Sequence, residues 1–222
     1  VLSLSKIESE KIELVFEDFN LKNELETIVN SLEVIANKYH NVILINFDLN
    51  VPQFIKSDKT RLSQIIMNLL SNALKFTKNG TINIYVYTNN NNTLNLEIID
   101  TGIGISYEFI DKIFDKFVQV DSNSDDQFQG TGLGLAIVKR FIEALSGNIQ
   151  IESEINKGTS VKFSIPLILG KETTETYLNN NINTLQNLNV LVVDDNKVNQ
   201  IVTQKILEKN NLNCTIAIDG YH

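Results

Sequence analysis

Three glycines at alternating positions are the clearest chemical signal in this chain. They lie in the segment Gly130-Thr131-Gly132-Leu133-Gly134, and the residues that follow have the apolar spacing of an amphipathic helix. Glycine allows positive φ and brings backbone N–H groups close to an anion, and a helix N-terminus carries partial positive charge. The segment therefore predicts a phosphate-binding loop, although a glycine-rich turn that only caps a helix would have the same pattern.

A carboxylate at the end of a strand is the second candidate for chemistry. An alternating apolar run from Leu96 ends at Asp100, and Gly102 and Gly104 come soon after it. The pattern predicts a strand that delivers the carboxylate to the mouth of a pocket. An ionised carboxylate only accepts hydrogen bonds, so it would suit an exocyclic amine such as that of adenine. An ordinary Asp-Thr-Gly turn is the alternative.

Residues 58–77 predict an amphipathic helix with an unusual polar stripe. Asn68, Asn72 and Lys75 fall on one side at helical spacing, in line with Arg61 and Gln64. Asparagine is a poor helix former, so two of them in mid-helix indicate a compensating role. Amide oxygens are suitable ligands for Mg²⁺ and a lysine can meet a phosphate; a solvated polar face is the alternative. The core-facing stripe is Leu62, Ile65, Ile66, Leu69, Leu70 and Ala73.

The order of these motifs resembles the histidine-kinase branch of the ATPase superfamily that also includes type II topoisomerases and mismatch-repair ATPases. In that family an asparagine-bearing helix, an Asp-x-Gly-x-Gly strand end, a phenylalanine segment and a Gly-x-Gly-x-Gly loop follow one another, as they do here. The phenylalanine segment resembles residues 113–119, with Phe114 and Phe117, and the closing strand resembles residues 158–167. The resemblance runs from about Phe19 to Leu167. It implies an α/β (α+β) two-layer sandwich of helices on a mixed sheet, with a lid over ATP.

The resemblance also implies roles for individual residues. Asp100 would hold the adenine amino group, with Gly102 and Gly104 beside the base and Thr159 in support. The other residues that it places at the nucleotide are Phe114, Phe117, Gly130, Thr131, Gly132, Leu133 and Gly134.

The phosphates of ATP would meet the polar stripe of the helix. By the same resemblance, Asn68 and Asn72 would contact Mg²⁺ and the phosphates, and Lys75 would add charge. The polar segment Val118–Gln129 would form a mobile lid, because long loops without regular structure are usually functional or disordered.

One departure from the wider superfamily bears on the type of reaction. Hydrolysing relatives carry a glutamate one helical turn before the second asparagine, whereas this chain has Asn68 there. An amide cannot take a proton from water at neutral pH, which favours transfer of the γ-phosphate to another nucleophile. A slow ATPase and a catalytically degenerate regulatory module that binds nucleotide remain the alternatives.

The histidine that would receive the phosphate is not evident in this sequence. The two histidines, His40 and His222, do not lie in a family-like helix where histidine precedes an acidic residue. Residues 1–16 resemble the end of a dimerisation helix, so the phosphoacceptor helix would come before them. We therefore expect a piece of a longer, homodimeric protein with the histidine on a separate domain.

The C-terminal part resembles the start of a response-regulator receiver domain, with a flavodoxin-like fold. An apolar strand ends in Asp194 and Asp195, a helical pattern follows, and a second strand begins near Cys214. Paired carboxylates at the end of a strand can bind Mg²⁺, although they could also only cap the helix. We expect residues 17–168 to form the ATP-binding domain, 169–186 a linker and 187–222 an incomplete receiver.

Composition agrees with an intracellular, cytoplasmic domain, whether or not the parent protein is anchored in a membrane. One cysteine excludes an internal disulfide framework, and no apolar run is long enough for a membrane helix. The net charge of −8 argues against nucleic acid as a main partner, because phosphate backbones need a basic face. A polyanion such as ATP would therefore depend on local cations and N–H groups.

Overall fold

The computed structural model describes residues 12–89, 92–115, 118, 132–172, 189–193, 200, 203–204, 207 and 212–217. The chain divides into two compact units, Val1–Glu172 and Thr173–His222. The candidate site lies in the first unit. None of the helices among the described residues combines the length and the apolar character that a bilayer span requires.

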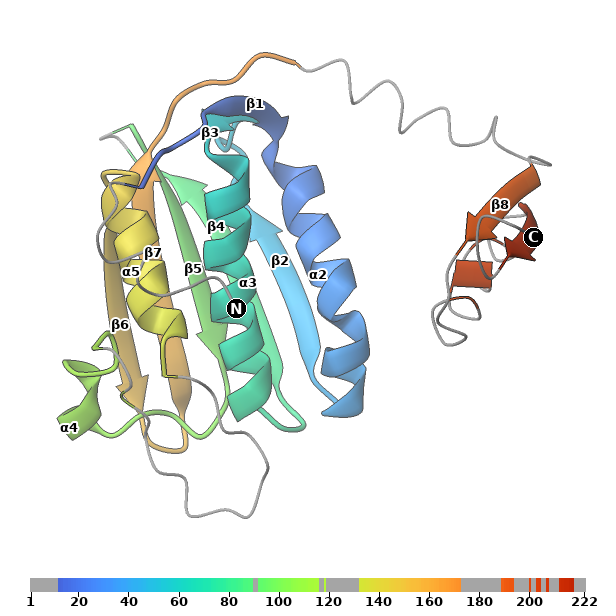
Figure 1. Cartoon of the computed structure of the whole chain (residues 1–222). Helices are drawn as coiled ribbons and strands as arrows, with labels where there is room; N and C mark the ends of the chain where they lie inside the picture. The colour runs from blue at the N-terminus through green and yellow to red at the C-terminus, as the bar shows by residue number, and fades with distance from the viewer. Residues whose placement is uncertain are drawn as a thin grey trace. The chain divides into compact units, whose positions relative to one another are not determined.

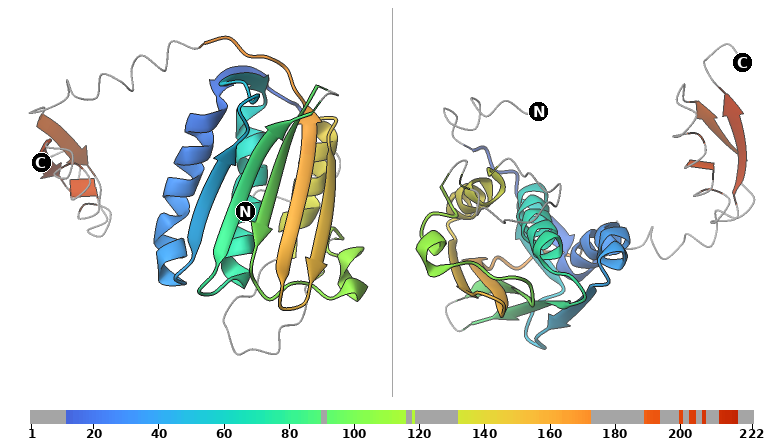
Figure 2. Two further views of the ribbon diagram at one scale, coloured as in Figure 1. Left: turned by 180° about the vertical axis from the view of Figure 1, so that it is seen from behind. Right: turned by 90° about the horizontal axis from the view of Figure 1, so that it is seen from below.

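Three helices cover one face of the main sheet in the first unit, as Figure 1 and the end-on view of Figure 2 show. They are α2 (Leu21–Lys38), α3 (Lys59–Phe76) and α5 (Gly134–Ala144). Asparagine caps α2, since the side chain of Asn20 accepts a hydrogen bond from the N–H of Asn23 at 3.0 Å. Each helix has an apolar stripe that packs inwards, as the residue spacing requires.

The main sheet has five strands in the order β2-β4-β5-β7-β6. These are β2 (Val42–Phe47), β4 (Thr81–Thr88), β5 (Thr93–Asp100), β7 (Gly158–Pro166) and β6 (Asn148–Glu154). Only the β2–β4 pair of this sheet is parallel, and the chain between these two strands contains β3 (Phe54–Ser57) and α3, which form the crossover that parallel pairing requires. No helix covers the other face of the sheet among the described residues, as the rear view in Figure 2 shows.

A two-stranded antiparallel sheet precedes α3. It pairs β1 (Glu17–Asn20) with β3 (Phe54–Ser57). On its other side, β3 contacts the segment that follows β7. There the Gly170 N–H donates to the Phe54 carbonyl at 3.0 Å. Gly170, which the sequence places in a linker, therefore hydrogen-bonds to β3, as does the carbonyl of Ile168 just before it, which accepts from Lys56 N–H at 2.9 Å.

The start of α3 is tied to the chain that enters the unit. One carboxylate oxygen of Asp58 accepts from the N–H of Arg61 at 2.9 Å, which caps α3. The other oxygen accepts from the N–H of Val15 at 3.0 Å. Asp58 is buried, and its two oxygens thereby anchor residues 12–16 to the first turn of α3.

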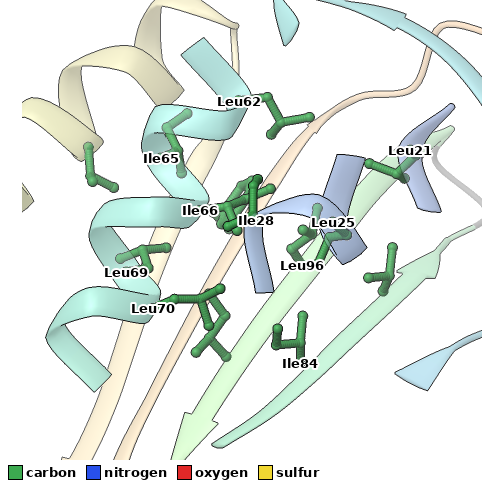
Figure 3. Packing of buried hydrophobic residues seen from close by; sticks show 14 of the residues in the cluster. Leu21, Leu25, Ile28, Leu62, Ile65, Ile66, Leu69, Leu70, Ile84 and Leu96 are labelled. Atoms are coloured by element: carbon green, nitrogen blue, oxygen red, sulfur yellow. The ribbon is translucent and has the colours of Figure 1, made fainter. Parts of the chain in front are cut away.

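The hydrophobic core lies between the helices and the sheet (Figure 3). The predicted apolar stripe of α3 is confirmed: all six of its residues are buried. They pack against Leu21 and Leu25 of α2 and against Ile84 and Leu96 of the central strands. Burial of complete leucine and isoleucine side chains stabilises the fold by about 1.5–3 kcal/mol each.

The second unit is described only in part. Its strands β8 (Asn189–Val193) and β9 (Asn213–Ala217) pair in parallel, with Val190 opposite Cys214. Parallel pairing of consecutive strands requires a crossover connection between them. Asp194 and Asp195 lie outside the described residues, so the receiver assignment and its Mg²⁺ site stay predictions.

Candidate nucleotide site

Asp100 is buried at the carboxyl end of the central strand β5, with only 8% of its surface exposed. Its Oδ1 atom accepts from the backbone N–H of Gly102 at 2.8 Å and of Thr159 at 3.3 Å. Both backbone bonds use the same oxygen, and Oδ2 accepts no hydrogen bond of acceptable geometry from any described residue. A carboxylate held in this way presents one oxygen to a hydrogen-bond donor of a ligand.

Burial raises the pKa of the Asp100 carboxyl above its usual value, and the two backbone N–H groups and the Thr77 hydroxyl act in the opposite direction. Thr77 is fully buried, and its hydroxyl forms no hydrogen bond of acceptable geometry with the described residues. Its effect on Asp100 is therefore that of a nearby hydroxyl dipole rather than of a formed hydrogen bond. Thr77 was not predicted as a site residue, because its only signal in the sequence is its position directly after the last residue of the helix.

The two glycines of the strand end are required by close packing of the chain against itself. A Cβ on Gly102 would collide with the carbonyl oxygen of Phe76 and would lie 2.8 Å from Asp100 Oδ1. Gly104 has a φ of 69° and abuts the backbone of Glu154. These glycines let the turn after β5 lie between the end of α3 and the β6–β7 hairpin.

Thr159 supports Asp100 through its backbone rather than its hydroxyl. The hydroxyl lies 2.8 Å from Ser153 Oγ, while the Thr159 N–H donates to Asp100. Ser153 Oγ in turn accepts from the N–H of Ile105 at 2.8 Å. Ser153 thus links the turn after β5 to the closing strand, and nothing in its local sequence indicated this role.

Asn68, Asn72 and Lys75 project from α3 at positions separated by four and three residues, so they lie along one side of the helix. Asn68 uses its Nδ2 to donate to the Gln64 carbonyl at 3.1 Å, which leaves its Oδ1 available. No carboxylate of the described residues pairs with Lys75. Partial burial lowers the pKa of the Lys75 ammonium, so an anion beside it would be favourable.

The N-terminus of α5 lies beside Asn68. A Cβ on Gly134 would stand 3.4 Å from Asn68 Oδ1, which is van der Waals contact and shows how near the two residues lie. The cap residue Leu133 provides no side-chain hydrogen bond, and the first turn of α5 contains no acidic residue. The first N–H groups of a helix, which have no partner within the helix, thus lie near an amide oxygen, an arrangement that suits a phosphate with its cation.

Part of the predicted nucleotide set is not described. Phe117, Gly130, Thr131 and residues 119–129 of the predicted lid lie outside the described residues. Gly132 has a φ of 67°, in agreement with its place in a tight turn before α5. The ammonium nitrogen of Lys139 lies over the Phe114 ring, 5.7 Å from the ring centre. Because Lys139 belongs to α5, this contact joins Phe114 to α5.

A groove of about 540 Å³ follows α2 and α3 and reaches Asn68 at one end. Glu24 dominates its polar contacts, since it pairs with Lys59 at 3.3 Å and accepts from Ser63 at 2.6 Å. Glu17 also lines the groove. This groove is separate from Asp100, and its carboxylates make it unsuitable for phosphates.

The comparisons with known proteins agree with this geometry. Residues 57–169 match the family described as histidine kinase-, DNA gyrase B-, and HSP90-like ATPase. The match covers about half of the chain, so the protein belongs to this ATPase family. The matched range contains Asn68, Asn72, Lys75, Asp100, Gly134 and Thr159.

The chain is also similar to curated sensor proteins. The chain is 35% identical to the autoinducer 2 sensor kinase/phosphatase LuxQ of Vibrio vulnificus, over 99% of this chain and 27% of that protein. It is 32% identical to the aerobic respiration control sensor protein ArcB of Escherichia coli, over 99% of this chain and 28% of that protein. The chain therefore spans about a quarter of the length of these relatives.

Solved structures share the fold of the first unit. The catalytic domain of histidine kinase ThkA has a TM-score of 0.60 at 28% identity, covering 68% of this chain and 95% of that chain. Full-length ShkA in complex with AMPPNP has a TM-score of 0.68 at 24% identity, covering 98% of this chain and 44% of that chain. The predicted sandwich of helices on a mixed sheet is confirmed, and it is the fold of histidine-kinase catalytic domains.

Proposed function

We propose that this chain binds Mg²⁺-ATP and presents the γ-phosphate to a histidine on a separate helical domain, as the catalytic part of a hybrid sensor histidine kinase. The observation that carries the proposal is the buried Asp100 carboxylate, whose Oδ1 is held by two backbone N–H groups. Oδ2 would then accept a hydrogen bond from the exocyclic amine of adenine. The rest of the nucleotide would then extend towards α3 and α5.

The phosphates would lie between the polar side of α3 and the N-terminus of α5. Asn68 and Asn72 would hold Mg²⁺ through their amide oxygens, and the ion would neutralise part of the charge on the phosphates. The closeness of Asn68 Oδ1 to Gly134 supports this placement. Lys75, which has no carboxylate partner among the described residues, would add a positive charge beside them.

The reaction would be transfer rather than hydrolysis. A histidine nitrogen would form a bond to the γ-phosphorus while the bond from that phosphorus to the β–γ bridging oxygen breaks, which releases ADP. Asn68 cannot act as a general base for water, because an amide takes no proton at neutral pH. The names of LuxQ and ArcB, a sensor kinase/phosphatase and a sensor protein, support a signalling role.

The surrounding parts follow the same proposal. Residues 1–16 would be the end of a dimerisation helix, 17–168 would form the catalytic domain, and 169–186 and 187–222 would be a linker and the start of a receiver. Histidine kinase ThkA has been solved in complex with the response regulator protein TrrA, which supports a receiver as a partner. The full-length protein would be a homodimer with this part in the cytoplasm.

Two linked measurements test the proposal. Calorimetric titration of Mg²⁺-ATP into the chain should show binding, and Asp100→Asn should weaken it about ten- to a hundred-fold while the circular dichroism spectrum stays folded. A supplied histidine-bearing domain should then acquire an acid-labile label from γ-labelled ATP. A folded chain that binds no ATP would favour a regulatory module, and steady phosphate release without labelling would favour a slow ATPase.

A further inference from the structure

We propose that Asn41 is a positioning residue for adenine recognition: it fixes the turn of residues 77–80 and so the end of β5 that this turn contacts, where Asp100 lies. Asn41 lies outside the matched family range and far from Asp100 in sequence. The inference rests on the proposed function, because it concerns the selectivity of the same pocket. It predicts that a residue without contact to the nucleotide controls the preference for adenine.

The side chain of Asn41 makes two hydrogen bonds to this turn. Its Nδ2 donates to the Thr77 carbonyl at 2.7 Å, and its Oδ1 accepts from the N–H of Gly80 at 3.0 Å. Only 5% of the residue is exposed. One amide thus spans both ends of the turn between α3 and β4, and hydrogen bonds in such a buried place are costly to lose.

Backbone bonds add to this connection between the end of α2 and the turn. The N–H of Asn79 donates to the Tyr39 carbonyl at 3.0 Å, and the N–H of Val42 donates to the Gly80 carbonyl at 2.9 Å. Asn79 has a φ of 52°, a strained value that such bonds help to maintain. The turn is therefore held from one side by residues 39–42.

On its other side the same turn meets the adenine pocket. A Cβ on Gly80 would collide with the hydroxyl of Thr101, the residue directly after Asp100, and the same hydroxyl accepts from the N–H of Thr81 at 3.0 Å. Burial raises the pKa of Asp100, and the buried Thr77 hydroxyl acts in the opposite direction. A Cβ on Gly80 would stand 2.6 Å from Thr77 Cγ2, so the position of Gly80 limits where the threonine can lie. The carbonyl of Phe76, directly before the turn, also accepts from Ile103 N–H at 3.2 Å.

The chemistry of the amide explains why asparagine suits this position. The turn offers one acceptor, the Thr77 carbonyl, and one donor, the Gly80 N–H, so the bridging side chain must both donate and accept. Aspartate at position 41 would still accept from Gly80 but would set a carboxylate against the Thr77 carbonyl. Asn41→Asp should therefore displace Thr77 with little change in side-chain volume.

The test is the ratio of affinities for Mg²⁺-ATP and Mg²⁺-ITP, measured by calorimetry on the whole chain. ITP carries a carbonyl where ATP has the amino group, so the ratio reports the contact with Asp100 and not general losses of stability or phosphate binding. We expect the wild type to prefer ATP, and Asn41→Asp to reduce that preference about ten-fold. The exposed Asn37→Asp, which adds the same charge at the end of α2, should leave the ratio unchanged.

The outcomes separate this inference from the proposed function. A wild type that binds neither nucleotide, or that shows no preference, would overturn the proposed adenine pocket itself. A wild-type preference that Asp100→Asn abolishes and Asn41→Asp leaves within two-fold would overturn the role of Asn41 alone. If Asn41→Asp does not fold, Asn41→Ala, which removes both hydrogen bonds without adding a charge, decides: loss of the preference supports the inference, and an unchanged ratio overturns it.

Discussion

Asn68 on α3 and Gly134 at the start of α5 approach each other so closely that a Cβ on the glycine would lie 3.4 Å from Asn68 Oδ1. An amide oxygen on one helix thus lies beside the uncapped N-terminus of another. The two helices bring together an oxygen ligand and free N–H groups from segments more than sixty residues apart. In the proposed function, this relationship would give the phosphate site its two kinds of contact.

The role of Asn68 can be tested by truncation. Asn68→Ala should weaken Mg²⁺-ATP about ten-fold, because it removes an oxygen ligand of the cation, and should leave the affinity for adenosine unchanged. Calorimetric titration with both ligands measures this. Ser71→Ala, on an exposed position of the same helix, is the matched control. Equal losses for adenosine and ATP would contradict a phosphate-side role.

Asp100→Asn should weaken ATP binding without lowering the stability of the fold. The asparagine Oδ1 can still accept from Gly102 and Thr159, and the variant no longer buries a charge in a site that raises the pKa of the carboxyl. The free energy of unfolding at pH 7 should therefore stay the same or rise by about 1 kcal/mol, although ATP binding weakens. Denaturant unfolding measures this, and a large fall in stability would show that the carboxylate is structural.

The raised pKa of Asp100 also predicts how binding and stability depend on pH. The folded state favours the protonated carboxyl, so the stability cost is absent below the unfolded pKa and grows as the pH rises through the folded pKa. Adenine recognition needs the ionised form, so ATP affinity should fall as the pH falls through the raised pKa. The ratio of wild-type to Asp100→Asn affinities between pH 4 and 8 isolates this titration from that of ATP. A ratio that does not change with pH would argue against an ionised Asp100 in the complex.

A substitution of Leu70, which is fully buried on α3, tests the packing of the hydrophobic core. Leu70→Ala should lower the free energy of unfolding by about 2–5 kcal/mol, since it removes apolar contacts and leaves a cavity. Leu49 is fully exposed, so Leu49→Ala should change the stability by less than about 0.5 kcal/mol. Denaturant titration of both variants compares them, and similar effects would contradict the described packing.

Asp58→Asn tests the anchor between the entering chain and α3. An asparagine can keep the cap bond to Arg61, but its NH₂ group cannot accept from the N–H of Val15. We expect faster amide hydrogen exchange at Val15 and a loss of about 1–2 kcal/mol in stability. Asp48→Asn, where the carboxylate accepts from the nearby Asn50, serves as the control. Unchanged exchange at Val15 would contradict the anchor.

Local pattern was sufficient to predict much of this fold. The helix of residues 58–77, the hairpin of residues 81–88 and 94–99, and the helix after Gly134 are confirmed as α3, β4–β5 and α5. Their periodicity is strong, and the core-facing residues follow directly from it. The position of Asp100 at the end of β5 is confirmed for the same reason.

Contacts between distant segments could not be predicted in this way. Asn41 meets Thr77 across 36 residues, and Thr159 meets Asp100 across 59 residues. Such pairs depend on strand order and on the parallel β2–β4 pairing, which no local spacing encodes. A lone asparagine after a helix is usually part of a turn, so its buried bridge is visible only in three dimensions.

The Asp58 carboxylate couples the stability of two segments, the first turn of α3 and residues 12–16. A change that stabilises the Val15 contact also stabilises the cap of α3, and a change that weakens one contact weakens the other by the same coupling free energy. Asn68 and Asn72 lie on the same helix, about three and four turns beyond Asp58. One continuous helix, with no loop in it, therefore joins the entering chain to the proposed phosphate ligands.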